Sequence, residues 1–502
     1  MRSSDFCPLA LVGFQIVKDR GPAIVVDNRS SHDSSASGAF SLIDGSIELR
    51  KGGLAIDNTP EAKTLYLRNV YIKGADGLVK SGAEDAVEGA GGEWSRIREY
   101  VYTDQRLPGE KPAYGDSDNF FRTFSLIDGT LSREAQPVCV IESAAAAPAD
   151  LLSRHVWENL PSYEGQNDGT KVVASGSRRT ENNEAEDSRP AIQAAIDEAS
   201  AEGHGRVFLP AGEYRIGGTL NLRANTKLFG VGRRISVIAC HDSWRPTEGE
   251  ATMLLTDNDP QADTTLAFLS IEARALGGGT NAIGANDWDR FNHIHWRAGR
   301  GSMIVAIQLD KEWTTNEQIS NPHDYLKFTD SGGGRHYFLC PSTRWFGKHP
   351  DSRAVRVAGT REPLAFYGLN LEFVARTPET TPKTNVEMIG TENVRIYGVK
   401  REMATSTLIL RDCRNVALFN HGRQASQPFR GSGGHFQILG ASDNIAIGPA
   451  IIDVAHGTAN GEPMLRESLA GGATHEILYP ECISIYKRGE LDDSVFAPAS
   501  KP

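Results

Sequence analysis

Short stretches of alternating apolar and polar residues recur along the chain, separated by turns rich in glycine, asparagine and aspartate. Such alternation is typical of β-strands that bury one face. The most regular stretches, residues 393–398, 415–420 and 444–448, start 22 and 29 residues apart, and each follows an earlier strand-like stretch. This interval is typical of one coil of a β-helix with loops of variable length. We therefore predict parallel coils over residues 187–480, with a stacked interior formed by Val394, Ile396, Val416, Leu418, Ile445 and Ile447.

An asparagine opens each of these three stretches. Asparagine tolerates tight turns and its side chain hydrogen-bonds the backbone, so a column of asparagines stabilises the same corner of successive coils. We interpret Asn393, Asn415 and Asn444 as structural residues.

Length and composition agree with a repeat array and exclude some functions. A chain of 502 residues exceeds one ordinary core, so two domains or one elongated array are expected. The 51 glycines suit β structure that is rich in turns. The net charge of −11, without a cluster of basic residues, argues against a nucleic-acid-binding face. No apolar run approaches the roughly 20 residues of a membrane span.

Changes in composition divide the chain into three parts. Residues 1–133 carry strand-like stretches and are expected to form an N-terminal β-helical part. Residues 134–189 contain an alanine-rich stretch and a polar stretch from Ser175 to Asp187, and we interpret them as a linker. Proteases are expected to cut first between Ser175 and Asp187. Residues 190–502 are expected to form a parallel β-helix that starts with a short helix, whose apolar face contains Ile192, Ala195, Ile196 and Ala199.

The start of the third part resembles a known family. The helical segment 191–197, followed by the strand-like segment 207–214 (Val-Phe-Leu-Pro-Ala-Gly-Glu-Tyr), is similar to the opening of pectate-lyase-superfamily domains. The resemblance implies an all-β, right-handed parallel β-helix whose first coil is capped by the helix. Two β-helical parts in one chain are similar to glycoside hydrolase family 55, whose members carry tandem β-helix domains, and here the first part is expected to be truncated.

Two glutamates occupy equivalent places in neighbouring coils. The Tyr-Gly pairs at 367–368 and 397–398 are each followed, four residues after the glycine, by Glu372 and Glu402, which are 30 residues apart. Adjacent coils lie about 4.8 Å apart, so the two carboxyl groups are expected to lie close together, and one is expected to hold a proton near neutral pH. Such a pair suits glycoside hydrolysis, in which one carboxyl group protonates the leaving oxygen and the other assists the attack.

Family 55 enzymes resemble this stretch in having a Tyr-Gly-Val segment that leads to a glutamate. The chain departs from the family where a glutamate after a Gln-Asn pair serves as the general acid, because residues 420–424 here are Asn-His-Gly-Arg-Gln. The resemblance implies a polysaccharide-degrading hydrolase with a β-glucan type of substrate. Three alternatives stay open: a structural ladder of glutamates neutralised by Lys400, Arg401 or Arg395, a Ca²⁺-dependent polysaccharide lyase, and a non-catalytic glycan-binding adhesin or phage spike.

Five further residues are expected to bind the substrate. Lys400 lies close to Glu402 in sequence, Asp412 and His421 belong to the next coil, and His421 is expected to point into the same cleft. Trp288 and Trp313 belong to a tryptophan-rich stretch and are expected to stack on sugar rings.

The six cysteines lie far apart and form no CxxC pair, which indicates neither a zinc site nor a disulfide framework. No cofactor is expected unless the protein is a Ca²⁺-dependent lyase. The expected partner is a polysaccharide or oligosaccharide, with no nucleic acid and no membrane. We expect the protein to be secreted or periplasmic, although the N-terminus shows no recognisable signal peptide.

Overall fold

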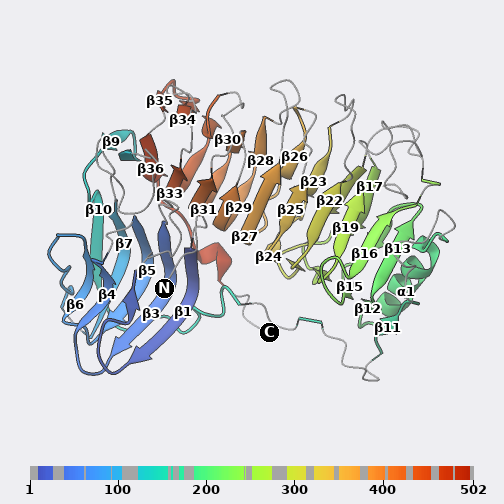
Figure 1. Cartoon of the computed structure of the whole chain (residues 1–502), viewed down its shortest axis with the longest axis horizontal. Coiled ribbons are helices and arrows are strands. Elements are labelled where there is room, and N and C mark those ends of the chain that lie inside the picture. Colours follow the sequence, from blue (N-terminus) through green and yellow to red (C-terminus); the bar gives the residue numbers. More distant parts are fainter. Residues whose placement is uncertain are drawn as a thin grey trace.

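The computed structural model describes most of the chain. The described residues are 9–26, 39–60, 64–91, 93–103, 122–156, 160–161, 169–174, 186–241, 243–244, 251–273, 291–311, 322–343, 350–373, 383–401, 405–424, 433–453, 463–478 and 481–497. They form an almost entirely β structure, which confirms the predicted fold class. Two β-helical bodies lie next to each other, a short one built from the N-terminal strands and a long one built from the later coils (Figure 1).

The N-terminal body contains two small sheets. β1 (Leu9–Lys18), β3 (Phe40–Leu49) and β5 (Leu65–Lys73) are parallel neighbours, and β7 (Trp94–Tyr102) and β10 (Val138–Ala144) extend this sheet with antiparallel strands. A second, parallel sheet contains β2 (Ile24–Val25), β4 (Leu54–Asn58) and β6 (Gly77–Ser81). Both sheets supply buried side chains to one core, among them Leu42, Ile47, Ile56, Val70 and Val79. This body is a short parallel β-helix that ends in antiparallel strands.

The predicted helix α1 (Arg189–Ala201) lies at one end of the C-terminal body. Ile192, Ile196 and Ala199 are buried. The helix packs against β11 (Lys171–Val172), β12 (Arg206–Leu209) and β14 (Leu220–Leu222) and covers this end of the solenoid (Figure 1), which shields the edges of the first coil. Among the described residues, no helix combines the length and apolarity that crossing a membrane requires.

The coils of this body contribute strands to three parallel columns and form a right-handed parallel β-helix. The first column contains β12, β15 (Lys227–Gly230), β18 (Thr265–Ala267), β21 (Met303–Val305), β24 (Gly334–Tyr337), β27 (Leu364–Phe373), β29 (Glu392–Arg401), β31 (Arg414–Gln424) and β33 (Asp443–Asp453). The second contains β13 (Gly212–Ile216), β16 (Ser236–Cys240), β19 (Ser270–Ala273), β22 (Gln308–Lys311) and β25 (Cys340–Thr343), and from β27 onward one long strand runs through both. The third contains β14, β17 (Ala251–Thr256), β20 (Phe291–Trp296), β23 (Asp324–Thr329), β26 (Arg353–Ala358), β28 (Thr384–Ile389), β30 (Ser406–Arg411), β32 (Phe436–Gly440) and β34 (Pro463–Leu469).

The register confirms the predicted interior. All six predicted residues are buried, and they pair coil by coil as Val394, Val416 and Ile445 and as Ile396, Leu418 and Ile447. The asparagine column is also present, because the Asn415 amide nitrogen donates to Asn393 Oδ1 at 2.8 Å. Both asparagines have a positive φ, which explains why this residue type suits the corner.

A strand from the first third of the chain closes the far end of the solenoid. β36 (Glu481–Arg488) pairs antiparallel with β33, and β8 (Arg122–Ile127) pairs in parallel with β36. β9 (Thr130–Ser132) forms a hairpin with β8, and β35 (Thr474–Leu478) folds back on β34. Part of the segment 1–133 therefore belongs in space to the C-terminal body.

The segment 134–189 also differs from the linker that its composition predicts. β10 lies within it and pairs with β7, since the apolar, β-branched run Val-Cys-Val-Ile outweighs the alanines and proline that follow. The predicted cleavage stretch, 175–187, lies outside the described residues except for its last two positions. The boundaries at residues 133 and 189 stay predictions.

Candidate functional site

A column of aromatic rings follows the outer surface of the first strand column. Tyr337, Tyr367, Tyr397 and Phe419 are Cα partners in successive coils. Their rings stack with successive centroids 4.6, 4.9 and 5.7 Å apart. Tyr66 of the N-terminal body stacks on Phe419 at 5.5 Å, so the column continues into the contact between the two bodies.

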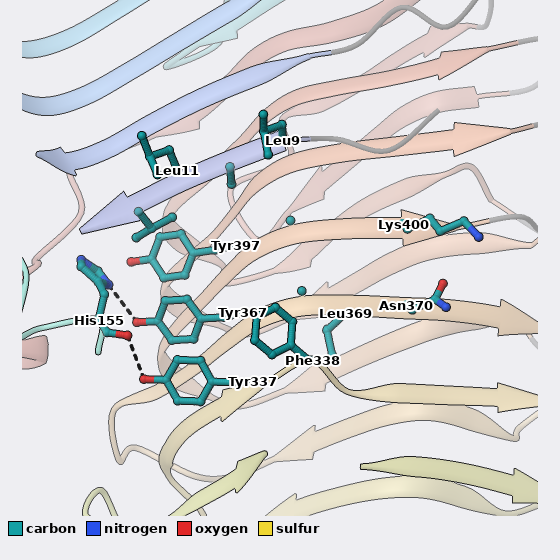
Figure 2. Close-up of a pocket in the computed structure, with 14 residues that line it drawn as sticks. Leu9, Leu11, His155, Tyr337, Phe338, Tyr367, Leu369, Asn370, Tyr397 and Lys400 are labelled. Atoms are coloured by element: carbon teal, nitrogen blue, oxygen red, sulfur yellow. Dashed lines mark hydrogen bonds between the residues drawn. The ribbon is translucent and has the colours of Figure 1, made fainter. Parts of the chain in front are cut away.

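A cavity of about 430 Å³ lies between this aromatic column and β1 (Figure 2). Residues 9–12 of β1 form the wall on the N-terminal side, and the opposite wall includes Phe338, Leu369 and the three tyrosines. The volume falls within the range of small-molecule sites. Because each body supplies one wall, the cavity exists only when the two bodies are packed together.

The cavity follows the corner between the first and second strand columns. At this corner Phe338, Gly368 and Gly398 have φ values of 54°, 73° and 76°, which lie in the left-handed region. Glycine adopts this conformation without strain, whereas a bulky side chain rarely does. The repeated Tyr-Gly pair therefore has a structural cause, since the tyrosine joins the aromatic column and the glycine makes the turn.

His155 connects the aromatic column to the N-terminal body. Its Nδ1 lies 2.8 Å from the Tyr367 hydroxyl, its Nε2 lies 2.7 Å from Asp44 Oδ2, and its carbonyl accepts a 2.9 Å hydrogen bond from the Tyr337 hydroxyl. In the neutral imidazole, Nε2–H donates to Asp44 and Nδ1 accepts from Tyr367. Burial raises the pKa of Tyr337 to about 12 and holds the pKa of Tyr367 well above its usual range. These hydroxyls therefore stay protonated and act as donors, not as general bases.

Arg335 holds the segment that carries His155. Its Nη1 donates to the carbonyl oxygens of Ser153, Arg154 and Val156, each at 3.2 Å. A guanidinium group offers several donors in a rigid plane, which suits a cluster of carbonyl oxygens. The wall of the cavity at His155 is thus tied to β24 by side-chain and backbone contacts.

The polar end of the cavity carries Asn370 and Lys400, which are Cα partners in adjacent coils. The Asn370 amide nitrogen donates to Cys340 Sγ at 3.5 Å, whereas its Oδ1 is buried and accepts no hydrogen bond among the described residues. Lys400 supplies a positive charge, and no carboxylate occurs among the described residues that line the cavity. Apolar walls with a polar, cationic end fit a ligand that has one apolar face and several hydroxyl or anionic groups.

The two predicted catalytic glutamates are described only in part. Glu372 lies in β27, where its Cα pairs with Ser342, and its side chain lies outside the described part of the structure. Glu402 lies outside the described residues altogether. The residues directly before the two glutamates, Leu371 and Arg401, are Cα partners in adjacent coils, as the predicted one-coil offset requires. The catalytic pair stays a prediction.

His421 lies in the interior of the solenoid, so the expectation that it points into the cleft is wrong. It is fully buried, and its Cα partner in the preceding coil is the core residue Val399. Its Nε2 lies 3.2 Å from Thr407 Oγ1, and its ring meets Phe436 edge-on. The alternation of side chains along the strand directs this position inward in every coil that pairs here.

Asp412 is an exposed turn residue between β30 and β31. Its φ is 54°, and its carboxylate accepts a 2.7 Å hydrogen bond from the backbone N–H of Ala441. Gly390 makes the corresponding turn of the preceding coil with a φ of 56°. This turn lies at a different corner from the cavity, so the contacts of Asp412 support a structural role and not the expected contact with substrate.

Trp288 and Trp313 lie outside the described residues. Elsewhere in the tryptophan-rich stretch, Trp296 is fully buried and its indole N–H donates to the Gly333 carbonyl at 3.2 Å, while Trp244 packs against the core. Phe338 is the exposed aromatic residue in the described lining of the cavity, with 51% of its surface accessible.

Within the described ranges, no group of three or more His, Cys, Asp or Glu side chains is arranged to hold a metal ion. The cation at the polar end is Lys400, and the other lining residues are apolar, aromatic or amide-bearing. The described residues of the cavity therefore do not fit a Ca²⁺ site, and no chemical step is assigned to a metal.

In a comparison with protein-family models, residues 172–340 match the family described as rhamnogalacturonase A/epimerase, pectate lyase-like. This segment is similar to pectate lyase-like proteins. It starts in β11 and ends at the start of β25, so it contains the capping helix as well as Tyr337 and Phe338 of the cavity. The predicted pectate-lyase-superfamily β-helix is confirmed, and the resemblance to glycoside hydrolase family 55 stays a prediction.

Curated relatives match over short stretches. Mannuronan C5-epimerase AlgE3 and alginate lyase 7, both from Azotobacter vinelandii, are 45% identical over 67 residues and 42% identical over 65 residues. Each match covers 12% of this chain, but only 4% and 8% of the respective relative. The polygalacturonase from Erwinia carotovora ssp. carotovora is 12% identical over 58% of this chain and 83% of its own, with a TM-score of 0.33, which is too low to carry an argument.

The residues of β1 and His155 that complete the cavity could not be recognised from the sequence. Leu9, Leu11 and His155 lie far from the Tyr-Gly pairs in sequence, and no local pattern connects them. A signal for Phe338 was present, because Tyr337-Phe338 precedes Tyr367-Gly368 by one coil and places a large residue where the next coils have glycine.

Proposed function

We propose that this protein is a polysaccharide-modifying enzyme whose saccharide chain binds in the cavity between β1 and the aromatic column. The observation that carries the proposal is the pairing of Asn370 with Lys400 in adjacent coils, because both line the cavity and each is followed two residues later by a glutamate, Glu372 or Glu402. The pectate lyase-like segment supports a saccharide-active β-helix. An enzyme with such a substrate would act outside the cytoplasm, as a secreted or periplasmic protein.

The proposed reaction is hydrolysis of a glycosidic bond, as in glycoside hydrolase family 55, with a β-glucan type of substrate. One carboxyl group of Glu372 and Glu402 gives its proton to the leaving glycosidic oxygen while the bond from that oxygen to the anomeric carbon breaks. The other, as a carboxylate, assists the attack on the anomeric carbon, and water supplies the new hydroxyl and the returned proton. Neighbouring coils about 4.8 Å apart favour a retaining reaction, in which the second carboxylate itself attacks the anomeric carbon and water then displaces it.

Elimination or epimerisation on a uronic-acid polymer is the second candidate. Two of the relatives, a mannuronan C5-epimerase and an alginate lyase, favour it. Lys400 at the polar end of the cavity is also suited to a carboxylate-bearing sugar. In both reactions a base removes the proton next to the carboxylate, and the electron pair then either expels the glycosidic oxygen or takes up a proton on the other face.

The test is a product analysis of the purified full chain with neutral glucans and with polyuronates. Hydrolysis is expected to give new reducing ends without near-ultraviolet absorbance, and elimination is expected to give both. Epimerisation is expected to give neither, but to change the C5 signals in the NMR spectrum of the polymer. Binding without any of these products would overturn the enzyme proposal in favour of a glycan-binding adhesin.

A further inference from the structure

Phe338 combines exposure with an unfavourable backbone conformation. Its side chain is 51% exposed, and its φ of 54° is one that bulky residues rarely adopt. Backbone strain of this kind occurs at functional sites and ligand clamps. Phe268 and Ala306 make the same corner in earlier coils with φ values of 57° and 52°, so the exposure of its ring is what distinguishes Phe338. The next two coils make the same corner with Gly368 and Gly398, so the fold itself does not require an aromatic residue here.

Phe338 lies in the cavity lining between a glycine of its own wall and the aliphatic side chains of the facing wall. Gly368 makes space for the ring, since a Cβ atom at that glycine would lie 3.3 Å from Cδ1 of Phe338. Leu9 and Leu11 of β1 form the opposite wall (Figure 2), and both are partly buried. The space between the two walls is therefore bounded by an aromatic ring on one side and by aliphatic side chains on the other.

The polar end of the cavity limits which ligand fits. Asn370 Oδ1 is buried without a donor among the described residues, and leaving such an acceptor unpaired is unfavourable. A hydroxyl group that enters the cavity can donate to it, and Lys400 lies in the next coil beside it. A pyranose ring matches this arrangement, because it has C–H groups on its faces and hydroxyl groups around its rim.

We propose that Phe338 is the platform of a pyranose-binding subsite, with β1 as the facing wall and the Asn370–Lys400 pair as its polar end. This inference rests on the proposed function and deepens it, since it names the part of the cavity that holds a sugar ring and the residue that selects for one. Phe338 acts in binding and takes no part in bond breaking.

Phe338→Gly is the decisive variant, because glycine suits the left-handed corner and removes the ring without adding strain. Phe268→Gly is the matched control. Phe268 makes the same corner two coils earlier with a φ of 57°, is partly buried, and is not part of the cavity lining. Phe338→Trp keeps an aromatic platform and checks that the ring, not its exact shape, is needed.

The probes are a neutral glucan oligosaccharide and an oligouronate of equal length, titrated into the full chain by NMR with saturation transfer. At least one probe is expected to bind, with an affinity that falls about tenfold in Phe338→Gly and changes less than about twofold in Phe268→Gly and Phe338→Trp. Unchanged affinity in Phe338→Gly, or no binding of either probe to the natural chain, would overturn the subsite. If binding depends on Phe338 but no product forms, the subsite is supported and the enzyme proposal is contradicted. If product forms at the same rate with and without the Phe338 ring, the enzyme proposal is supported and the subsite is contradicted.

Discussion

The phenol ring of Tyr367 lies on that of Tyr397 one coil later, with centroids 4.9 Å apart and ring planes inclined by 19°. The two rings share a stack but not a hydrogen-bonding role. The Tyr367 hydroxyl contacts His155 Nδ1 at 2.8 Å, whereas the Tyr397 hydroxyl makes no hydrogen bond with the described residues. Comparing substitutions at Tyr367 and Tyr397 therefore distinguishes the contribution of ring stacking from that of the hydrogen bond to the N-terminal body.

Replacing Tyr367 by phenylalanine is expected to lower the free energy of unfolding by about 1–3 kcal/mol, because Nδ1 of the buried His155 loses its partner. Tyr397→Phe keeps the ring stack, and it is expected to change the free energy of unfolding by less than about 0.5 kcal/mol. Urea denaturation at pH 7 measures both values. Equal effects of the two substitutions would contradict the proposed link through His155.

Glu402→Gln is expected to reduce turnover by about 10²-fold or more, the usual scale for loss of a general acid or base, and to leave the unfolding midpoint nearly unchanged. The matched control is Glu392→Gln, since Glu392 lies on β29, is ion-paired with Arg361 at 3.4 Å, and does not line the cavity. The measurement is the initial rate on whichever polysaccharide the product analysis identifies. A glutamate of a purely structural ladder would give the opposite pattern, a shift in unfolding with full activity.

His336 is expected to make the fold sensitive to mild acid. It lies in the interior column between the apolar residues Ile304 and Phe366, and burial lowers its pKa to about 3. The folded state thus keeps the imidazole neutral while the unfolded state takes up a proton below pH 6.5, so stability is complete above that pH and falls by at most about 1.4 kcal/mol for each pH unit down to about pH 3.

In His336→Leu this slope is expected to disappear. The variant is also expected to lose about 1–3 kcal/mol at pH 7, because the backbone N–H of Ile304 donates to His336 Nδ1 at 3.1 Å and would be left unpaired. Urea denaturation from pH 7 to pH 4 compares the two chains. Parallel profiles over this range would show that the interior histidine is not the cause.

Asp493 joins the two bodies through two arginines. Its carboxylate accepts from Arg68 Nη2 at 2.7 Å and from Arg395 Nη2 at 2.9 Å. Burial alone would raise the pKa of Asp493, but the two guanidinium groups together hold it well below its usual range. The stability that this contact provides is therefore present above about pH 4 and is lost as the pH falls toward the lowered pKa.

Asp493→Asn is expected to lower the free energy of unfolding by about 1–2 kcal/mol at pH 7, and the difference from the natural chain is expected to narrow below about pH 4. This expected loss of stability is smaller than the usual cost of breaking a buried ion pair, because the Asp493 side chain is 32% exposed and solvent screens its charge. Arg133→Gln is the control, since Arg133 is exposed and forms an ion pair with Glu481 at the surface. A constant difference at every pH would contradict a role for the Asp493 charge.

The sequence predicted the interior of the solenoid well because the signal there is local and repeated. Val394, Val416 and Ile445 occupy the same place in coils of similar pattern, and burial follows from alternation within each strand. The inward orientation of His421 was indicated by the matching residue of the preceding coil, Val399, which is apolar and lies in the interior.

The cavity could not be predicted in the same way. His155 meets Tyr367 across 212 residues, and β1 meets coils more than 300 residues away, so no repeat or motif encodes these contacts. They arise only when two separate bodies pack, and that packing depends on the shapes of whole surfaces. The Tyr-Gly pairs indicated the correct corner of the solenoid, although their repetition turned out to have a structural cause.

The strand β8 is synthesised long before its partner strand β36. Ser484 Oγ donates to the Phe124 carbonyl at 2.7 Å across 360 residues of chain. At a synthesis rate of about 5–20 residues per second, β8 leaves the ribosome roughly 20–70 seconds before β36 exists. Until then its hydrogen-bonding edge is open, and an open edge invites pairing with other chains. Versions of the protein that end before β36 would keep that edge open permanently, which makes β8 the first place to look when a shortened chain aggregates.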